Sequence, residues 1–118
     1  MEPHGEILIV EDDAGIRQAL RDLLLEEGFR VLEAQDGAEA LAIVARMSNP
    51  PCVVLLDLMM PRMTGWEVLR AWEADGSVDS HRVCIISAYS DRAPPTVHRV
   101  FRKPLDVRRL LETVQALC

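Results

Sequence analysis

The chain has 118 residues, nearly half of them apolar, and a formal net charge of −6 at neutral pH. This length predicts a single domain, residues 1–118, with enough apolar side chains for a sizeable core. The acidic balance and the scattered arginines leave no broad cationic surface, which disfavours direct binding to nucleic acid or to an anionic membrane. No apolar stretch approaches the roughly 20 residues that cross a bilayer, and residues 1–6 do not resemble a signal peptide. We therefore expect a cytoplasmic protein without a membrane partner.

The first half of the chain alternates between strand and helix patterns. Residues 7–10 form a continuous apolar run, which predicts a buried strand. Apolar side chains then recur at helical spacing over residues 16–24, and Gly28 follows where this helix would end. Residues 30–34 are predicted as a short second strand, and residues 38–47 as a second helix.

The second half of the chain continues this alternation. Residues 52–56 are apolar at every position, as expected of a central parallel strand that is covered on both faces. The remaining predicted elements are a helix over residues 65–74, strands over residues 83–86 and 100–101, and a last helix over residues 107–117.

Strands that alternate with helices predict an α/β fold, a doubly wound parallel sheet of five strands with helices on both faces. In such folds, ligands bind beyond the carboxyl ends of the strands. One segment departs from the alternation, because Lys103 follows Ser87 by only 16 positions and the segment includes Pro94 and Pro95. Proline disrupts a helix interior, so we expect the fourth helix to be shortened or missing.

Cysteines and histidines show no spacing typical of a metal or catalytic site. Cys52 and Cys84 lie in apolar runs where a thiol packs as a small hydrophobic group, and no CxxC pair is present. We therefore expect all three cysteines to be reduced. His4, His81 and His98 fall in stretches predicted as loops or termini, where we expect solvated side chains.

Carboxylates follow two of the predicted strands directly. Asp57 follows the third strand, and Glu11, Asp12 and Asp13 follow the first. Two strands that end at the same edge of a sheet would bring these groups together, and such a cluster attracts a divalent cation. Taken alone, Asp57 is more simply a loop acid, and Asp12 or Asp13 a helix cap, so the other motifs decide between these interpretations.

Four short motifs occur in register at the ends of the first, third, fourth and fifth strands. They are Glu11-Asp12-Asp13 with Arg17, Asp57 with Met60-Pro61 and Gly65, Ser87-Ala88, and Lys103-Pro104. Together they resemble the receiver domain of bacterial two-component response regulators, and the resemblance covers essentially the whole chain. It implies a flavodoxin-like sheet with the strand order 2-1-3-4-5.

The resemblance implies that Asp57 is the phosphoacceptor. Asp12, Asp57 and the backbone carbonyl of Met59 are the implied ligands of one Mg²⁺, and Glu11 would act through a metal-bound water. Because clustered carboxylates repel one another, at least one should have a raised pKa when no metal is bound.

Two further residues are implied to contact the phosphoryl group. The Ser87 hydroxyl would donate a hydrogen bond to a phosphoryl oxygen, and the Lys103 ammonium would contact the group and neutralise the acids before phosphorylation. In the family, the peptide bond equivalent to Lys103–Pro104 is cis. Taken singly, Ser87 is more simply a turn residue and Lys103 a solvated cation.

One switch position departs from the family pattern. An aromatic residue usually lies three positions before the lysine, where this chain has Val100. Phe101 is displaced by one position, which turns it to the opposite face of a strand, and we expect it in the core. This departure disfavours aromatic switching. Tyr89 is expected either to gate access to the site or to pack within its loop.

The resemblance implies a signalling domain and not a metabolic enzyme. Such a domain takes a phosphoryl group from a histidine kinase or phosphotransfer protein, catalyses its own phosphorylation and acyl-phosphate hydrolysis, and switches its interaction with an output domain or protein, here unknown. The alternative is a pseudo-receiver, an interaction module that phosphorylation does not switch. Phosphorylation-dependent hydrogen exchange around residues 89–100 would separate the two. Nucleotide hydrolysis is disfavoured because no GxxxxGK[ST] motif follows the first strand.

Overall fold

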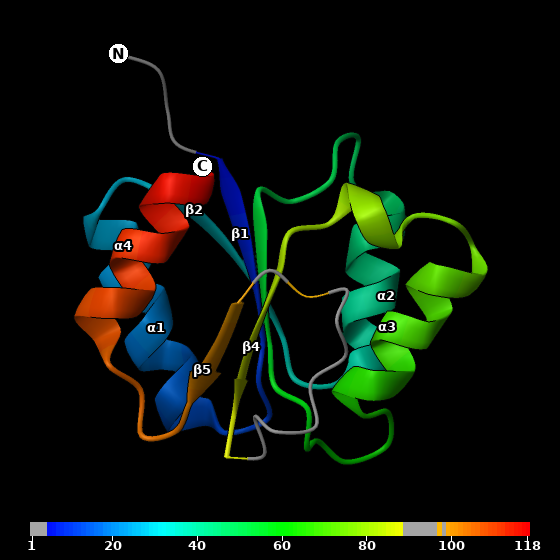
Figure 1. The fold of residues 1–118 in the computed structure, drawn as a ribbon, viewed down its shortest axis with the longest axis horizontal. Coiled ribbons are helices and arrows are strands. Elements are labelled where there is room, and N and C mark those ends of the chain that lie inside the picture. The colour runs from blue at the N-terminus through cyan, green and yellow to red at the C-terminus, as the bar shows by residue number, and fades with distance from the viewer. Residues whose placement is uncertain (1–4, 89–96, 98) are drawn as a thin grey trace.

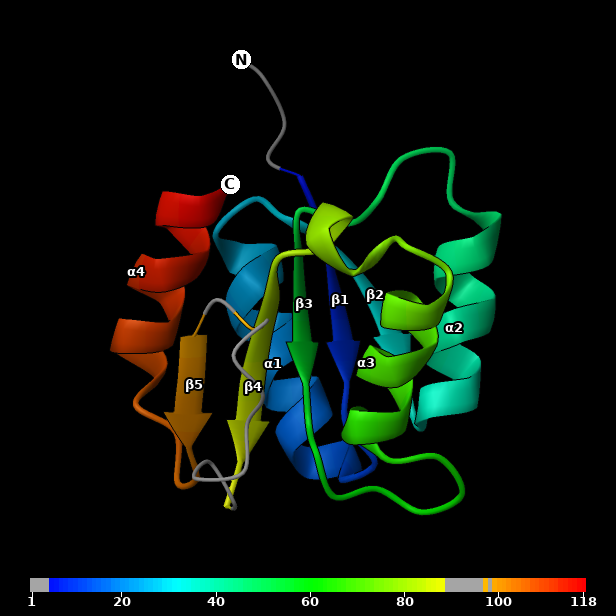
Figure 2. The same cartoon turned by 45° about the vertical axis from the view of Figure 1, so that its right-hand side comes forward.

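Five strands form one parallel sheet in the order β2-β1-β3-β4-β5 (Figures 1 and 2). A computed structural model describes residues 5–88, 97 and 99–118. The strands are β1 (Glu6–Val10), β2 (Arg30–Ala34), β3 (Val53–Leu56), β4 (Val83–Ser87) and β5 (Arg99–Arg102). Both the parallel sheet and its strand order confirm the predicted fold class.

Helices cover both faces of the sheet. They are α1 (Ala14–Glu26), α2 (Gly37–Arg46), α3 (Gly65–Ala74) and α4 (Val107–Leu117), with a short 3₁₀ helix, η1 (Val78–Ser80). Figure 1 shows α1 and α4 on one side of the sheet and α2 and α3 on the other. The sheet is therefore doubly wound, as predicted. The 3₁₀ helix was not predicted, because three residues are too few to show a periodic pattern.

Alternate residues of the central strands supply two separate cores. Ile7 and Ile9 of β1 pack with α1 and α4, whereas Leu8 and Val10 pack with α2 and α3. All four residues of β3 are fully buried. This burial on both faces explains why the run around β3 is apolar without alternation.

The cysteine prediction was wrong. Cys52, just before β3, and Cys118, just after α4, form a disulfide with a Cα–Cα distance of 5.8 Å. Their separation of 66 residues gives no local sequence signal. Cys84 is free and buried, and its burial raises the pKa of the thiol to about 11.

The prediction of a solvated His81 was also wrong. Its side chain is buried, with 4% exposure, and its ring lies 4.3 Å from that of Trp72. Within the described residues neither ring nitrogen has a hydrogen-bond partner, and burial lowers the pKa of the imidazole. His4 and His98 lie outside the described residues.

Other predictions also fall in undescribed parts of the chain. Residues 89–96 and 98 are not described, so the shortened or missing fourth helix and Tyr89 lie outside the described residues. Among the residues that are described, no helix is both long and apolar enough to span a bilayer.

Candidate functional site

Three carboxylates meet at the carboxyl ends of the two central strands. In the register of β1 and β3, Val10 pairs with Leu56, so the residues that follow the two strands emerge side by side. The Asp57 backbone N–H donates to the Val10 carbonyl at 3.0 Å and extends this pairing. Carboxylate oxygens of Glu11, Asp12 and Asp57 all lie within 4.8 Å of one another. The predicted acidic cluster is therefore formed.

A lysine faces the two buried carboxylates of this cluster. Glu11 is fully buried and Asp57 is 3% exposed, whereas Asp12 is exposed to solvent. The Lys103 ammonium lies 2.6 Å from Glu11 Oε1 and 3.4 Å from Asp57 Oδ2. Lys103 follows β5, and its peptide bond to Pro104 is cis. The ammonium thus lies where it compensates the buried negative charge.

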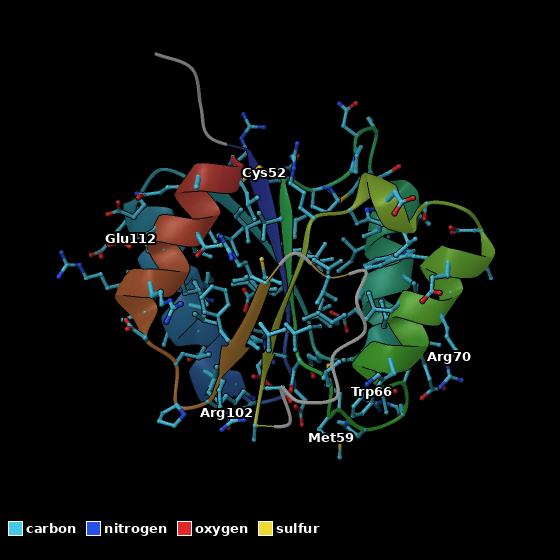
Figure 3. The ribbon with its side chains drawn as sticks, viewed as in Figure 1. Cys52, Met59, Trp66, Arg70, Arg102 and Glu112 are labelled. Atoms are coloured by element: carbon cyan, nitrogen blue, oxygen red, sulfur yellow. A yellow bond between two sulfur atoms is a disulfide. The ribbon has the colours of Figure 1, made fainter. Side chains whose placement is uncertain are left out.

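Ser87 and Met59 complete an open pocket of about 220 Å³ around these groups. Ser87 is the buried last residue of β4, and its carbonyl accepts a hydrogen bond from the Lys103 backbone N–H at 3.1 Å. The Met59 N–H donates to Asp57 Oδ1 at 3.3 Å, while the Met59 side chain is about half exposed. Figure 3 shows Met59 and Arg102 at the end of the sheet opposite to Cys52.

Gly65 supports the backbone on which Asp57 lies. Its N–H donates to the Leu58 carbonyl at 3.0 Å. A Cβ at this position would overlap the Asp57 carbonyl oxygen and would lie 2.9 Å from the Leu58 Cα. The glycine in this motif is thus explained by close backbone packing against the loop that carries Asp57.

Asp13 serves as a helix cap, as the sequence indicated. Its carboxylate accepts a hydrogen bond from the Ile16 N–H at 3.0 Å, which satisfies one of the free amides at the start of α1. Asp13 lines the pocket but does not belong to the group of carboxylates that could hold a metal.

Burial and charge shift the acid–base properties of this pocket. Burial raises the pKa of Glu11 to about 7. The hydrogen bond to Lys103 lowers this pKa, whereas the neighbouring Asp57 carboxyl group raises it. Burial opposes the charge on Lys103, but its interactions with Glu11 and Asp57 outweigh that effect and raise the pKa of the ammonium. The expectation that one clustered carboxyl group has a raised pKa is thus met by Glu11.

In the metal-free protein, one glutamate carboxyl group should titrate near pH 7, because Glu11 ionises only at the cost of a buried charge. Its folded-state pKa lies above the ordinary value of 4.5, so this group should make the fold less stable as the pH rises from 4.5 towards 7. Carboxyl ¹³C NMR across this range measures the titration. Glu11→Gln should remove it, and glutamates that all titrate near 4.5 would contradict the prediction.

Val100 and Phe101 lie on opposite faces of β5. Val100 pairs with Ile85 of β4 and is 39% exposed. Phe101 is buried in the core between the sheet and the helices α1 and α4, so the prediction that it packs in the core is confirmed. Val100 is not among the described residues that line the acidic pocket.

A sequence model of the response regulator receiver domain matches residues 7–115. The chain belongs to this family. In response regulators, an acidic pocket such as that of Glu11, Asp12 and Asp57 is typical of phosphorylation sites.

Curated relatives of this receiver domain are longer proteins. The response regulator MprA of Mycobacterium sp. (strain KMS) is 38% identical over 123 residues, which cover 94% of this chain and 49% of that protein. MprA of Mycobacterium leprae is 37% identical, with 94% and 50% covered. The chain thus spans about half the length of the curated relatives it matches.

Solved receiver structures share the whole fold. The response regulator TrrA from Thermotoga maritima, in complex with Mg²⁺ and BeF, is 28% identical, with a TM-score of 0.80 and coverage of 98% of this chain and 100% of that chain. The chemotaxis response regulator CheY4 of Vibrio cholerae is 26% identical, with a TM-score of 0.80 and coverage of 96% and 98%.

Outside the pocket, the structure adds Glu33, which is connected to the Glu11 backbone through Arg17. Glu33 lies near the end of β2, and its carboxylate pairs with Arg17 and Arg21 of α1. Sequence reasoning missed Glu33, because an acid within a short strand shows no sign of its partner on a helix.

Proposed function

We propose that this receiver domain accepts a phosphoryl group on Asp57 from a histidine kinase or phosphotransfer protein, with Mg²⁺, and thereby switches its interaction with an output partner. The observation that carries the proposal is the Asp57 carboxylate, which lies beside two further carboxylates and 3.4 Å from the Lys103 ammonium. A nucleophilic carboxylate needs positive charge beside it, from the ammonium and from a cation that the neighbouring carboxylates would bind, because the approaching phosphoryl group is itself negative.

The transfer exchanges one bond for another at phosphorus. An Asp57 oxygen forms the new O–P bond while the P–N bond to the donor histidine breaks, and the leaving imidazole keeps the electron pair and takes up a proton. The Lys103 ammonium, already beside Asp57 Oδ2, attracts the phosphoryl oxygens as they enter the pocket. The Ser87 hydroxyl, at the buried end of β4, would donate to one of these oxygens.

The donor set fits a hard divalent cation. Three carboxylates within 4.8 Å of one another are oxygen ligands of the kind that Mg²⁺ prefers. Asp12, Asp57 and the backbone carbonyl of Met59 would hold the ion, with Glu11 acting through a bound water. When bound, the ion supplies the positive charge that lowers repulsion between the carboxylates and the phosphoryl group. The TrrA complex with Mg²⁺ and BeF supports this assignment.

Incubation with Mg²⁺ and acetyl phosphate should add one phosphoryl group to the protein, and Asp57→Asn should abolish the addition because an amide oxygen is a poor nucleophile. Intact-mass spectrometry measures the gain. Asp22→Asn is the matched control, since Asp22 is exposed and pairs only with Arg21 within the described residues. A parent protein that gains no mass, or an Asp57→Asn protein that still gains it, would refute the proposal.

A further inference from the structure

Arg17 of α1 connects the acidic segment to a neighbouring strand. Its Nη1 donates to the backbone carbonyl oxygen of Glu11 at 2.8 Å, and its Nε lies 3.2 Å from Glu33 Oε1. The Arg17 side chain is only 13% exposed. One guanidinium thus bridges the residue after β1 and an acid of β2, in the fixed fork geometry that arginine provides.

The backbone of Glu11 is held on both sides. Its N–H donates to the Ala34 carbonyl of β2 at 3.0 Å, and its carbonyl accepts from Arg17. That carbonyl belongs to the peptide bond that joins Glu11 to Asp12. Because this peptide unit is planar, its orientation fixes where the Asp12 Cα lies and therefore where the Asp12 side chain starts.

Asp12 depends on this backbone for its position. Among the hydrogen bonds and ion pairs of the described residues, none holds the Asp12 carboxylate, which is exposed to solvent. Its neighbours are both engaged, because Glu11 contacts Lys103 and Asp13 caps α1. A ligand without a bond of its own keeps its place only if the backbone that carries it is fixed, and Mg²⁺ demands near-ideal octahedral geometry.

We propose that Arg17 is a positioning residue of the metal site: by fixing the peptide between Glu11 and Asp12, it holds the Asp12 carboxylate where Mg²⁺ binds. The inference rests on the proposed function. Arg17 has no contact with Asp57 or Lys103 among its described interactions, so it acts through the backbone and not on the phosphoryl group.

The sign of the effect separates positioning from simple charge. A guanidinium close to an acidic pocket repels a cation, so its removal by charge alone would strengthen Mg²⁺ binding. If Arg17 instead positions the Asp12 carboxylate, its removal weakens Mg²⁺ binding. Arg21 provides the matched comparison, because it also lies on α1 and also pairs with Glu33, at 3.5 Å, but does not contact Glu11.

The test compares Arg17→Met with Arg21→Met in a titration with MgCl₂ alone, followed by ¹H–¹⁵N NMR. Both variants lose one positive charge and keep an apolar stem. The Mg²⁺ dissociation constant of Arg17→Met should rise roughly 10–100-fold, the range found when groups that orient metal ligands are removed. Arg21→Met should bind Mg²⁺ as tightly as the parent or more tightly. At saturating Mg²⁺, the Arg17→Met protein should recover the parental rate of phosphorylation by acetyl phosphate.

Equal or tighter Mg²⁺ binding by Arg17→Met would overturn the inference, as would a rate that stays low at saturating Mg²⁺. If Arg17→Met fails to fold, Arg17→Lys keeps the positive charge but lacks the fork that bridges Glu11 and Glu33, and it should also raise the dissociation constant. Unchanged binding in that variant would overturn the inference. A parent that binds Mg²⁺ but gains no phosphoryl group refutes only the proposed function, whereas a parent that binds no Mg²⁺ refutes both.

Discussion

Replacing Cys118 by serine should lower the free energy of unfolding by about 4 kcal/mol under oxidising conditions, the value expected when a cross-link of this span is lost. The disulfide between Cys52 and Cys118 closes a loop of 66 residues, which restricts the unfolded chain. Urea denaturation of the parent and of Cys118→Ser, each with and without dithiothreitol, measures the difference.

The reductant provides the internal control for this prediction. Dithiothreitol should lower the midpoint of the parent to that of Cys118→Ser and should leave the variant unchanged. A parent midpoint that does not respond to reductant would contradict the disulfide. Cys52 lies at the end of the sheet opposite to Met59 (Figure 3), so the variant should still accept a phosphoryl group below its unfolding transition.

Lys103→Met should slow the phosphorylation of Asp57 by acetyl phosphate roughly 10²–10³-fold, the cost of removing one group that stabilises charge in a transition state. The ammonium lies 3.4 Å from Asp57 Oδ2, where the proposed transfer would bring the phosphoryl oxygens. Rates at saturating Mg²⁺ measure the effect. Arg108→Met is the matched control, since Arg108 is 90% exposed on α4 and pairs only with Glu112 among the described residues.

Metal binding distinguishes this effect from damage to the site. Lys103 carries a positive charge 2.6 Å from Glu11, so its removal should leave Mg²⁺ affinity unchanged or raise it. An MgCl₂ titration of Lys103→Met tests this expectation. A variant that is phosphorylated at the parental rate would show that the ammonium plays no part in the transfer.

The strands and helices could be predicted because each leaves its own spacing of apolar residues in a short stretch of sequence. Continuous apolar runs indicated the buried strands, and the structure shows β3 fully buried. The observed bounds of some helices differ from the predicted ones by a residue or two, because a capping residue sets where the helix begins. An example is α2, which begins directly after its N-cap Asp36. The order of the strands came from the family resemblance and not from periodicity, since apolar spacing does not encode which strands pair.

The acidic cluster could be predicted because strand ends share one edge of a parallel sheet. Glu11, Asp12 and Asp57 were singled out by their position after apolar runs, and the pairing of β1 with β3 brings them together. Lys103 was singled out only as part of a motif. Its contact with Glu11 could not be inferred from spacing, because 92 residues separate them along the chain.

By itself, the sequence determined the alternation of strands and helices, the edge of the sheet where the carboxylates lie, and the family to which these motifs belong. Only the tertiary structure decided that Cys52 meets Cys118, that His81 is buried against Trp72, and that Arg17 joins the acidic segment to β2. The physical reason is the range of each interaction. Apolar periodicity and caps act between near neighbours, whereas disulfides, burial and bridges between elements depend on which distant segments pack together.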